Sequence, residues 1–163
     1  MAAVWLVIMG VAGCGKSSLG RDCAHALQLP FLEGDDFHPA ANIEKMRQGT
    51  PLTDADRAEW LDKLAQQLRL HTGGVVLACS ALKARFRATL RTAQPELKFV
   101  YLDISRAQAT ERVLARRGHF FPVTLLESQF DALEPPNAEP GVLCLGAENP
   151  REHLLAQSVS FVR

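Results

Sequence analysis

The stretch Gly10-Val11-Ala12-Gly13-Cys14-Gly15-Lys16-Ser17 decides the fold, because it matches the pattern G-x-x-x-x-G-K-[ST] at every defined position. It directly follows the apolar run Val4–Met9, which is typical of a strand buried on both faces. A helical pattern at residues 17–29 comes after it. A strand, a glycine-rich turn and a helix in this order predict a phosphate-binding loop (P-loop), in which backbone N–H groups surround a polyphosphate.

The residues of this loop have distinct expected roles. Glycines let the backbone approach a polyphosphate closely, and the positive end of the following helix lies beside it. We expect Lys16 to act as a catalytic residue at the β- and γ-phosphates of ATP, and the Ser17 hydroxyl to bind Mg²⁺. The alternative is a glycine-rich turn that matches the pattern by chance. The predicted nucleotide-binding residues of the loop are Gly10, Gly13, Cys14, Gly15, Lys16, Ser17 and Ser18.

Short apolar runs alternate with helical patterns along the rest of the chain. Because parallel strands need helical crossovers, this alternation predicts an α/β fold in three layers, with a five-stranded parallel sheet flanked by helices in a single domain, residues 1–163. One expected helix has Thr53 as its N-cap and Asp56 three residues later, a weak capping box. The further expected strands are 31–32, 75–79, 99–102 and 142–145, and the further expected helices are 40–48, 54–71, 82–92 and 107–117.

Composition excludes several classes of protein. The 163 residues include 18 Lys and Arg against 18 Asp and Glu, and this balance argues against wholesale binding to nucleic acid or to an anionic membrane. The apolar run at 4–9 is far shorter than the roughly 20 residues that span a bilayer. Four cysteines lie far apart without a Cys-x-x-Cys pair, so we expect no disulfide framework or zinc site and a cytoplasmic location.

Two other classes of P-loop protein lack their signatures. A GTPase needs an Asn-Lys-x-Asp stretch and an Asp-x-x-Gly switch, and neither occurs in the chain. A motor or AAA-type ATPase is expected to be longer and to carry an acid where the strand 75–79 ends, whereas Ser80 follows here. The acid that assists the metal is therefore expected elsewhere, and the obvious source is the stretch Glu33-Gly34-Asp35-Asp36.

The turn Glu33-Gly34-Asp35-Asp36-Phe37-His38-Pro39 carries three acids and a histidine just after the second strand. Because the carboxyl ends of parallel strands face the ligand crevice, these side chains are expected to point at the same site as Lys16. Asp35 is the predicted catalytic carboxylate, placed to accept or orient a hydroxyl proton. The alternative is a solvated helix start with Asp36 as a cap and Pro39 as its first residue. For His38 the alternative is a simple turn residue.

These motifs, with others in the same order as far as about Pro135, resemble the gluconokinase family, whose members have a P-loop kinase fold with a mobile lid. The further blocks that carry the resemblance are Asn42 with Glu44-Lys45-Met46, Gly49-x-Pro51-Leu52-x-Asp54-x-Asp56-Arg57 with Trp60-Leu61, Cys79-Ser80-Ala81-Leu82-Lys83, Gly118-His119-Phe120-Phe121, and Ser128-Gln129-Phe130-x-x-Leu133-Glu134-Pro135.

The resemblance implies phosphoryl transfer from ATP to the terminal hydroxyl of D-gluconate, with Mg²⁺ as cofactor and a homodimer as the assembly. It implies a metal site at Ser17 and Glu33, although Glu33 stands where related kinases more often have aspartate. Because glutamate has the longer side chain, both a direct and a water-mediated contact of Glu33 with the metal stay open. The implied substrate-binding residues are Asp35, His38, Arg57, Ser80, Lys83, Arg87, His119 and Gln129.

Half of the basic side chains lie between Ser80 and Arg117, so the zero net charge conceals a basic region. Lys83 and Arg87 are four residues apart on an expected helix, and such a basic face suits an anionic sugar acid. The alternative is a solvated helix face, which we prefer for Arg85 and Arg91.

An arginine-rich helix end followed by glycine and aromatic residues indicates a lid at about residues 112–130. Closing a lid excludes water and brings an arginine to the developing charge. The resemblance implies Arg116 as the catalytic arginine and Arg112 as the residue that stacks on adenine. Pro150 lies where related kinases wrap a loop around adenine, or else it only starts the final helix.

Two competing functions remain at this point. The first is a related kinase for another small hydroxylated acceptor, such as shikimate or a nucleoside monophosphate. The second is a nucleotide-binding regulatory module, associated with RNA through the basic region, which would bind ATP without turnover. The acidic turn speaks against the second, because it would repel a polyanion.

Overall fold

The computed structural model describes residues 2–116 and 122–163. Five strands form one sheet in the order β2-β3-β1-β4-β5, and every neighbouring pair is parallel. This confirms the predicted five-stranded parallel sheet. The strands are β1 (Val4–Met9), β2 (Phe31–Glu33), β3 (Gly74–Ala78), β4 (Lys98–Asp103) and β5 (Val142–Gly146), and the helices are α1 (Lys16–Leu27), η1 (Gly34–Phe37, a 3-10 helix), α2 (Ala40–Arg47), α3 (Asp54–Leu70), α4 (Ala84–Ala93), α5 (Arg106–Ala115), α6 (Val123–Ala132) and α7 (Arg151–Val162).

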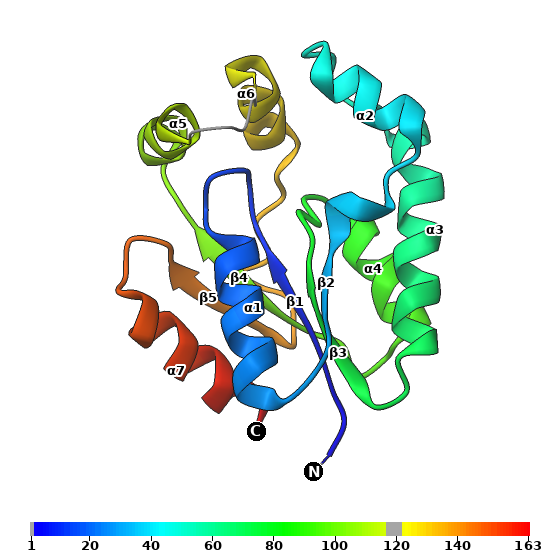
Figure 1. Ribbon diagram of the computed structural model, residues 1–163, viewed down its shortest axis with the longest axis vertical. Coiled ribbons are helices and arrows are strands. Elements are labelled where there is room, and N and C mark those ends of the chain that lie inside the picture. The colour runs from blue at the N-terminus through cyan, green and yellow to red at the C-terminus, as the bar shows by residue number, and fades with distance from the viewer. Residues whose placement is uncertain (1, 117–121) are drawn as a thin grey trace.

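Alternating side chains of β1 supply the two faces of the core. Leu6 and Ile8 pack into a cluster with residues of α1 and α7, whereas Trp5, Val7 and Met9 pack into a second cluster with residues of α3 and α4. Helices therefore cover both faces of the sheet, which gives the three layers (Figure 1). A strand that is buried on both faces must be apolar throughout, and this explains the continuous apolar run at 4–9.

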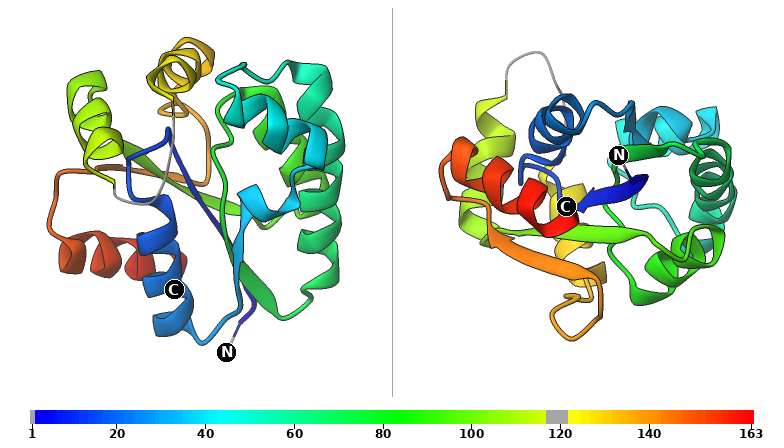
Figure 2. Two further views of the ribbon diagram at one scale, coloured as in Figure 1. Left: turned by 45° about the horizontal axis from the view of Figure 1, so that its top comes forward. Right: turned by 90° about the horizontal axis from the view of Figure 1, so that it is seen from below.

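The carboxyl ends of the strands lie at one end of the molecule, and both chain termini lie at the other end. The turn after β1 and the helices α2, α5 and α6 gather at one end, and the N- and C-termini lie at the other (Figures 1 and 2). The functional groups that follow the strands are thus brought to one edge of the sheet.

Two helices near the site differ from the sequence predictions in ways that matter for its residues. The helix expected at 82–92 begins only at Ala84, because Ala81 adopts a left-handed conformation with φ 45° and Lys83 is the extended N-cap. Lys83 thus precedes the helical face that carries Arg87. Residues 123–132, expected to be part of the lid, form the helix α6.

The helix caps near the acidic turn settle two further expectations. The capping box is confirmed: the Asp56 backbone N–H donates to Thr53 Oγ1 at 3.1 Å, and the Thr53 N–H donates to the Asp56 carboxylate at 2.9 Å. Asp36 does not cap α2, since Pro39 is the N-cap and that helix has no side-chain cap. Asp36 lies instead within the 3-10 turn η1.

None of the helices in the described part of the chain is long and apolar enough to cross a membrane. Cys14, Cys23, Cys79 and Cys144 all carry free thiols, as expected from their spacing.

Candidate active site

The P-loop forms an open cradle at the start of α1. Gly15 is the N-cap, with φ 97°, and no side chain caps the helix. A Cβ added to Gly15 would meet no other atom within 4 Å, so the space beside it is free. The first N–H groups of α1 have no intrahelical partner, and they attract an anion to this space.

The ammonium group of Lys16 lies over this cradle and donates a hydrogen bond to the Val11 carbonyl oxygen at 3.0 Å. An ammonium group has three donors, so further donors remain for a phosphate.

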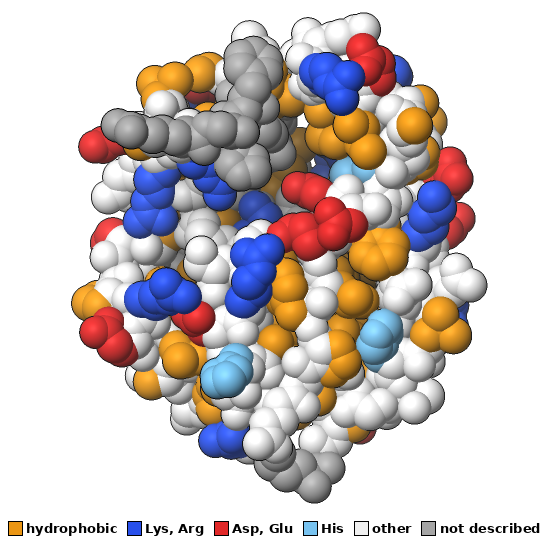
Figure 3. Space-filling view, in the orientation of Figure 1, with side chains coloured by type: hydrophobic (Ala, Val, Ile, Leu, Met, Phe, Trp, Pro, Cys, Tyr) orange, Lys and Arg blue, Asp and Glu red, His pale blue; other side chains and the backbone are white. Residues whose placement is uncertain are grey.

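A pocket opens between the P-loop, the acidic turn, α3 and α6. In the space-filling view, acidic side chains gather beside a hollow with a histidine at its edge (Figure 3). The predicted site residues that line the pocket are Gly13, Gly15, Lys16, Ser17, Glu33, Asp35, His38, Arg57, Ser80, Arg116 and Gln129. The pocket residues that we did not predict are Ala12, Met46, Leu52, Trp60, Leu82, Leu125 and Ser128.

Ser17 and Glu33 face one another across the pocket wall, and the Ser17 hydroxyl donates to the Glu33 carboxylate. Burial raises the pKa of Glu33, and the hydrogen bond from Ser17 opposes that shift. A hydroxyl beside a carboxylate offers the oxygen ligands that Mg²⁺ prefers, and Mg²⁺ usually completes its shell with water and phosphate. Within residues 2–116 and 122–163, no three His, Cys, Asp or Glu side chains gather closely enough to hold a metal by themselves.

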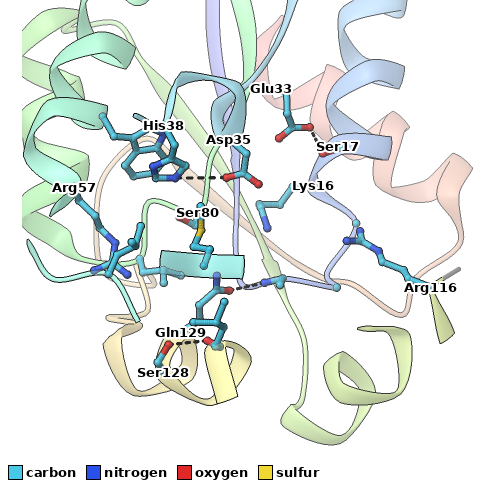
Figure 4. Close-up of a pocket in the computed structure, with 18 residues that line it drawn as sticks. Lys16, Ser17, Glu33, Asp35, His38, Arg57, Ser80, Arg116, Ser128 and Gln129 are labelled. Carbon is cyan, nitrogen blue, oxygen red and sulfur yellow. Dashed lines mark hydrogen bonds and ion pairs between the residues drawn. The ribbon is translucent and has the colours of Figure 1, made fainter. Parts of the chain in front are cut away.

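Asp35 is placed by a close approach of backbone at Gly34. A Cβ on Gly34 would lie 2.5 Å from the Ala78 carbonyl oxygen, so the turn can cross the end of β3 only with glycine at this position. The Asp35 side chain is 79% exposed. It points toward Lys16 across the pocket (Figure 4). The structure thus brings together a cation from the P-loop and a carboxylate from the acidic turn.

Arg57 projects from α3 and lines the side of the pocket that lies away from Arg116 (Figure 4). Its side chain is 14% exposed, and its guanidinium lies 3.8 Å from the Asp54 carboxylate. Burial lowers the pKa of Arg57 from its ordinary value. The group still carries its charge, since an arginine pKa lies far above neutrality. Arg57 is therefore a cation held within the wall of the pocket.

Gln129 and Arg116 approach the pocket from the two helices beside the undescribed residues 117–121. The Gln129 carboxamide oxygen accepts from the Ala12 backbone N–H at 2.7 Å. Arg116 follows α5 and enters the pocket on the side away from Arg57 (Figure 4). His119 lies outside the described residues, as does the Gly118–Phe121 motif of the expected lid.

The remaining predicted nucleotide-binding residues lie around the pocket and do not line it. Arg112 donates to the carbonyl oxygens of Gly13 and Cys14 at 3.3 and 3.4 Å, and to that of Ala147 at 3.1 Å. Arg112 thus links the P-loop to the segment after β5. Pro150 is the N-cap of α7. The other residues outside the lining are Gly10, Cys14 and Ser18.

Arg87 does not contact the pocket, which corrects the expectation that it binds substrate. Its side chain is 0% exposed, and its guanidinium donates to the Glu139 carboxylate and to the carbonyl oxygens of Ala81 and Glu134 at 2.7 and 2.8 Å. Arg91 donates to the same Glu139 carboxylate at 2.8 Å. Because Arg87 donates its hydrogen bonds to protein groups, it links the loop before β5 to α4.

Lys83 lies in a depression next to the pocket. Its ammonium donates to the Asp54 carboxylate at 3.0 and 3.1 Å, and Arg57 lines both the depression and the pocket. Lys83 therefore lines a depression that shares Arg57 with the pocket, and it does not line the pocket itself.

Comparisons with known proteins agree with this geometry. A protein-family model described as an AAA domain matches residues 5–136. The matched region spans the P-loop and most of the sheet, so the chain belongs to this broad class of P-loop domains, whereas the sequence prediction excluded only the function of a motor or AAA-type ATPase. The missing acid after β3 is thus no obstacle to membership of that broad class.

Proteins of known name are similar over most of the chain. The thermoresistant gluconokinase of Escherichia coli is 41% identical over 161 residues, which cover 96% of this chain and 92% of that protein. The gluconokinase of Gluconobacter oxydans is 44% identical over 151 residues, which cover 90% of this chain and 84% of that protein.

Solved structures show the same likeness. A gluconokinase from Sinorhizobium meliloti superposes with a TM-score of 0.90 at 40% identity and covers 97% of this chain and 90% of its own. A shikimate kinase from Aquifex aeolicus, with a TM-score of 0.66 at 16% identity and coverage of 97% and 95%, shares the fold.

Proposed function

The chain belongs to the gluconokinase family and acts as an ATP-dependent gluconate kinase, and we propose that the pocket between the P-loop and the acidic turn performs the transfer to the terminal hydroxyl. The observation that carries this proposal is the position of Asp35 opposite Lys16 in one pocket (Figure 4). A kinase needs a cation for the phosphates and a carboxylate for the acceptor hydroxyl, and the pocket offers both at its two sides.

The P-loop holds the donor in this proposal. Its backbone N–H groups bind the phosphates of ATP, and the Lys16 ammonium binds them through the donors that remain beside its bond to the Val11 carbonyl. Ser17 and Glu33 are the residues that would hold Mg²⁺. The ion, when bound, neutralises charge on the phosphate oxygens.

Asp35 acts on the acceptor. Phosphoryl transfer has a loose transition state, so most of the catalysis lies in positioning and in electrostatic stabilisation. The exposed Asp35 carboxylate accepts the hydrogen bond of the gluconate hydroxyl and takes its proton as the bond to phosphorus forms. Arg116, which enters from α5, stabilises the charge that spreads over the transferred group.

Arg57 and Lys83 recognise the acid end of gluconate. A carboxylate is held well by a guanidinium, which offers parallel donors, and Arg57 is the guanidinium in the pocket wall. Lys83, in the neighbouring depression, adds positive charge to the side of the pocket that Arg57 lines. Gln129 and Ser80 line the space between the two ends and contact the hydroxyl groups of the sugar acid.

A parallel assay tests the function. ADP formation is measured with gluconate, shikimate and AMP as acceptors at equal concentration, and turnover with gluconate alone is expected. Turnover only with shikimate or AMP would replace the acceptor. ATP binding without any turnover, together with RNA affinity that falls steeply with salt, would indicate a regulatory module instead.

A matched pair of variants tests the role of Asp35. Asp35→Asn is expected to lower kcat by about 10²- to 10⁴-fold, the usual contribution of a positioned acid or base, while ATP affinity stays unchanged. Asp36→Asn is the control, because Asp36 is the neighbouring exposed acid and does not line the pocket. Full activity of Asp35→Asn would remove Asp35 from the mechanism.

Three further properties complete the proposal. We expect Mg²⁺ dependence, abolished by a chelator and restored by added Mg²⁺. A homodimer is inferred from the family resemblance, and sedimentation at several protein concentrations measures it. We also propose a cytoplasmic location without nucleic-acid or membrane partners, and the balanced charge and the free thiols support it.

A further inference from the structure

The His38 imidazole is held in one orientation by Trp60. The ring is 5% exposed, and it stacks on the Trp60 ring with the centroids 4.5 Å apart and the planes 10° from parallel. The Trp60 indole N–H donates to the Gly34 carbonyl oxygen at 2.8 Å. The indole thus ties the imidazole plane to the same turn that carries Asp35.

Asn42, on α2, determines which ring nitrogen of His38 carries the proton. The Asn42 side chain is buried, with 4% of the residue exposed, and its Nδ2 lies 2.8 Å from the Asp56 carbonyl oxygen and 3.2 Å from His38 Nδ1. A backbone carbonyl only accepts, so the carboxamide atom beside it must be the nitrogen. One hydrogen of that nitrogen goes to Asp56, and the second is directed at His38. His38 Nδ1 is therefore an acceptor, and the neutral ring carries its proton on Nε2.

The other edge of the ring faces Asp35. His38 Nε2 lies 3.8 Å from the Asp35 carboxylate oxygen, too far for a direct hydrogen bond. Two atoms 3.8 Å apart can both lie within hydrogen-bond distance of one oxygen, and both residues line the same pocket.

We propose that Asn42 is a positioning residue, which fixes His38 as the Nε2–H tautomer, so that His38 donates a hydrogen bond to the acceptor hydroxyl oxygen while Asp35 accepts that hydroxyl's hydrogen. The inference rests on the proposed function for the identity of the acceptor. It assigns His38 as a hydrogen-bond donor and leaves proton abstraction to Asp35.

The step balances with His38 unchanged. The hydroxyl oxygen forms a bond to the γ-phosphorus, and the bond from that phosphorus to the bridging oxygen of ADP breaks. The hydroxyl proton passes to Asp35, and the Nε2 proton stays on His38. The charged groups that face the ring are Asp35 from η1, which favours the imidazolium, and Arg57 from α3, which opposes it. Burial also opposes the imidazolium and lowers the pKa of His38, so the neutral donor is the form present near neutrality.

Nitrogen-15 NMR of the full-length protein tests the tautomer directly. A long-range ¹H–¹⁵N spectrum distinguishes a protonated ring nitrogen from an unprotonated one, and comparison with His38→Gln identifies the His38 signals among those of the five histidines. Above the pKa of His38 we expect a proton on Nε2 and none on Nδ1. A proton on Nδ1 would overturn the proposal.

Variants of Asn42 test whether this residue fixes the tautomer of His38. Asn42→Leu removes the donor, and we expect His38 to become a mixture of tautomers. Asn42→Asp replaces the donor by an acceptor, so His38 should shift to the Nδ1–H or the charged form, and the acid limb of the kcat/KM profile should move to higher pH. An unchanged His38 spectrum in folded Asn42→Leu would show that Asn42 only supports packing, and would contradict the proposal.

A pair of His38 variants tests the donor. The amide of glutamine reaches about as far as Nε2, whereas that of asparagine ends near Nδ1, so His38→Gln should retain more activity than His38→Asn, by about tenfold in kcat/KM for gluconate. Equal losses would overturn the donor role, and if either variant does not fold, the wild-type spectrum decides. An Nε2–H signal in a protein that does not turn over gluconate would refute the proposed function alone, and an Nδ1–H signal in an active gluconate kinase would refute this inference alone.

Discussion

The carboxamide oxygen of Gln129 accepts a hydrogen bond of 2.7 Å from the Ala12 backbone N–H, and this bond joins α6 to the P-loop. Because the oxygen is occupied, the amide nitrogen is the end of the side chain that remains to donate within the pocket. Gln129 thus combines a structural bond to the P-loop with a donor to the hydroxyl groups of the sugar acid, and substitutions can separate the two.

Gln129→Met is expected to lower the stability of the protein, whereas Gln129→Glu is expected to lower its activity. Methionine fills the space but leaves the Ala12 N–H without its partner, so the free energy of unfolding should fall by about 1–3 kcal/mol. Glutamate keeps the acceptor, so stability should stay near that of the wild type. Its negative charge beside the anionic sugar acid should lower kcat/KM for gluconate at least about tenfold, since it replaces a donor by a repelling charge. Urea unfolding and steady-state kinetics check both variants, and a Gln129→Glu enzyme with wild-type kcat/KM would exclude the donor role.

Arg57→Met is expected to raise KM for gluconate by about 10- to 100-fold, the range of a hydrogen bond to a charged group, while KM for ATP stays constant. The physical reason is that Arg57 is the guanidinium in the pocket wall, opposite Arg116 (Figure 4). Arg47→Met is the matched control, because Arg47 is an exposed arginine on α2 that pairs only with Glu44 among the described residues. A gluconate KM unchanged in Arg57→Met would place the acid end of the substrate elsewhere.

The layers of the fold could be predicted because burial on both faces leaves a clear trace in sequence. In a chain of this composition, short apolar runs such as 4–9 indicate buried strands, and all five strands could therefore be predicted. The start of α4 could not be predicted, because it depends on a left-handed Ala81, an unusual conformation for a residue with a Cβ. Helix α6 was not predicted, because most of its residues were interpreted as part of a lid.

The site divides in the same way. Lys16 and Asp35 follow strand ends, so the parallel topology alone brings them together. Arg87 was misassigned because its partner Glu139 is 52 residues away, and sequence spacing gives no sign of such a contact. Asn42 was missed as a functional residue, although its position four residues after His38 was visible. Its role depends on the Asp56 carbonyl, which only the packing of α2 on α3 supplies.

Arg87→Met is expected to destabilise the protein without lowering the activity of the molecules that remain folded. It leaves the Glu139 carboxylate without its buried partner, and breaking a buried ion pair costs about 3–5 kcal/mol. Arg91→Met is the control, since Arg91 is partly exposed and its bond to the same carboxylate should contribute under about 1 kcal/mol. Chemical denaturation measures the difference. Equal costs for the two variants would contradict the structural role of Arg87, and a raised gluconate KM in Arg87→Met would restore it to the substrate site.

The pH dependence of stability follows from the neutral His38. Burial lowers the pKa of His38 below its ordinary value of 6.5, so in the pH range between the folded and unfolded pKa values the unfolded chain binds more protons at this residue. The free energy of unfolding should therefore fall as pH decreases through about 6.5, and this part of the loss should be absent in His38→Gln. Urea unfolding of both proteins at several pH values between about 7.5 and 5 gives the difference. A raised folded pKa would produce the opposite sign, with His38 adding stability as pH falls, and would mean that the attraction of Asp35 outweighs burial, Arg57 and the Asn42 donor.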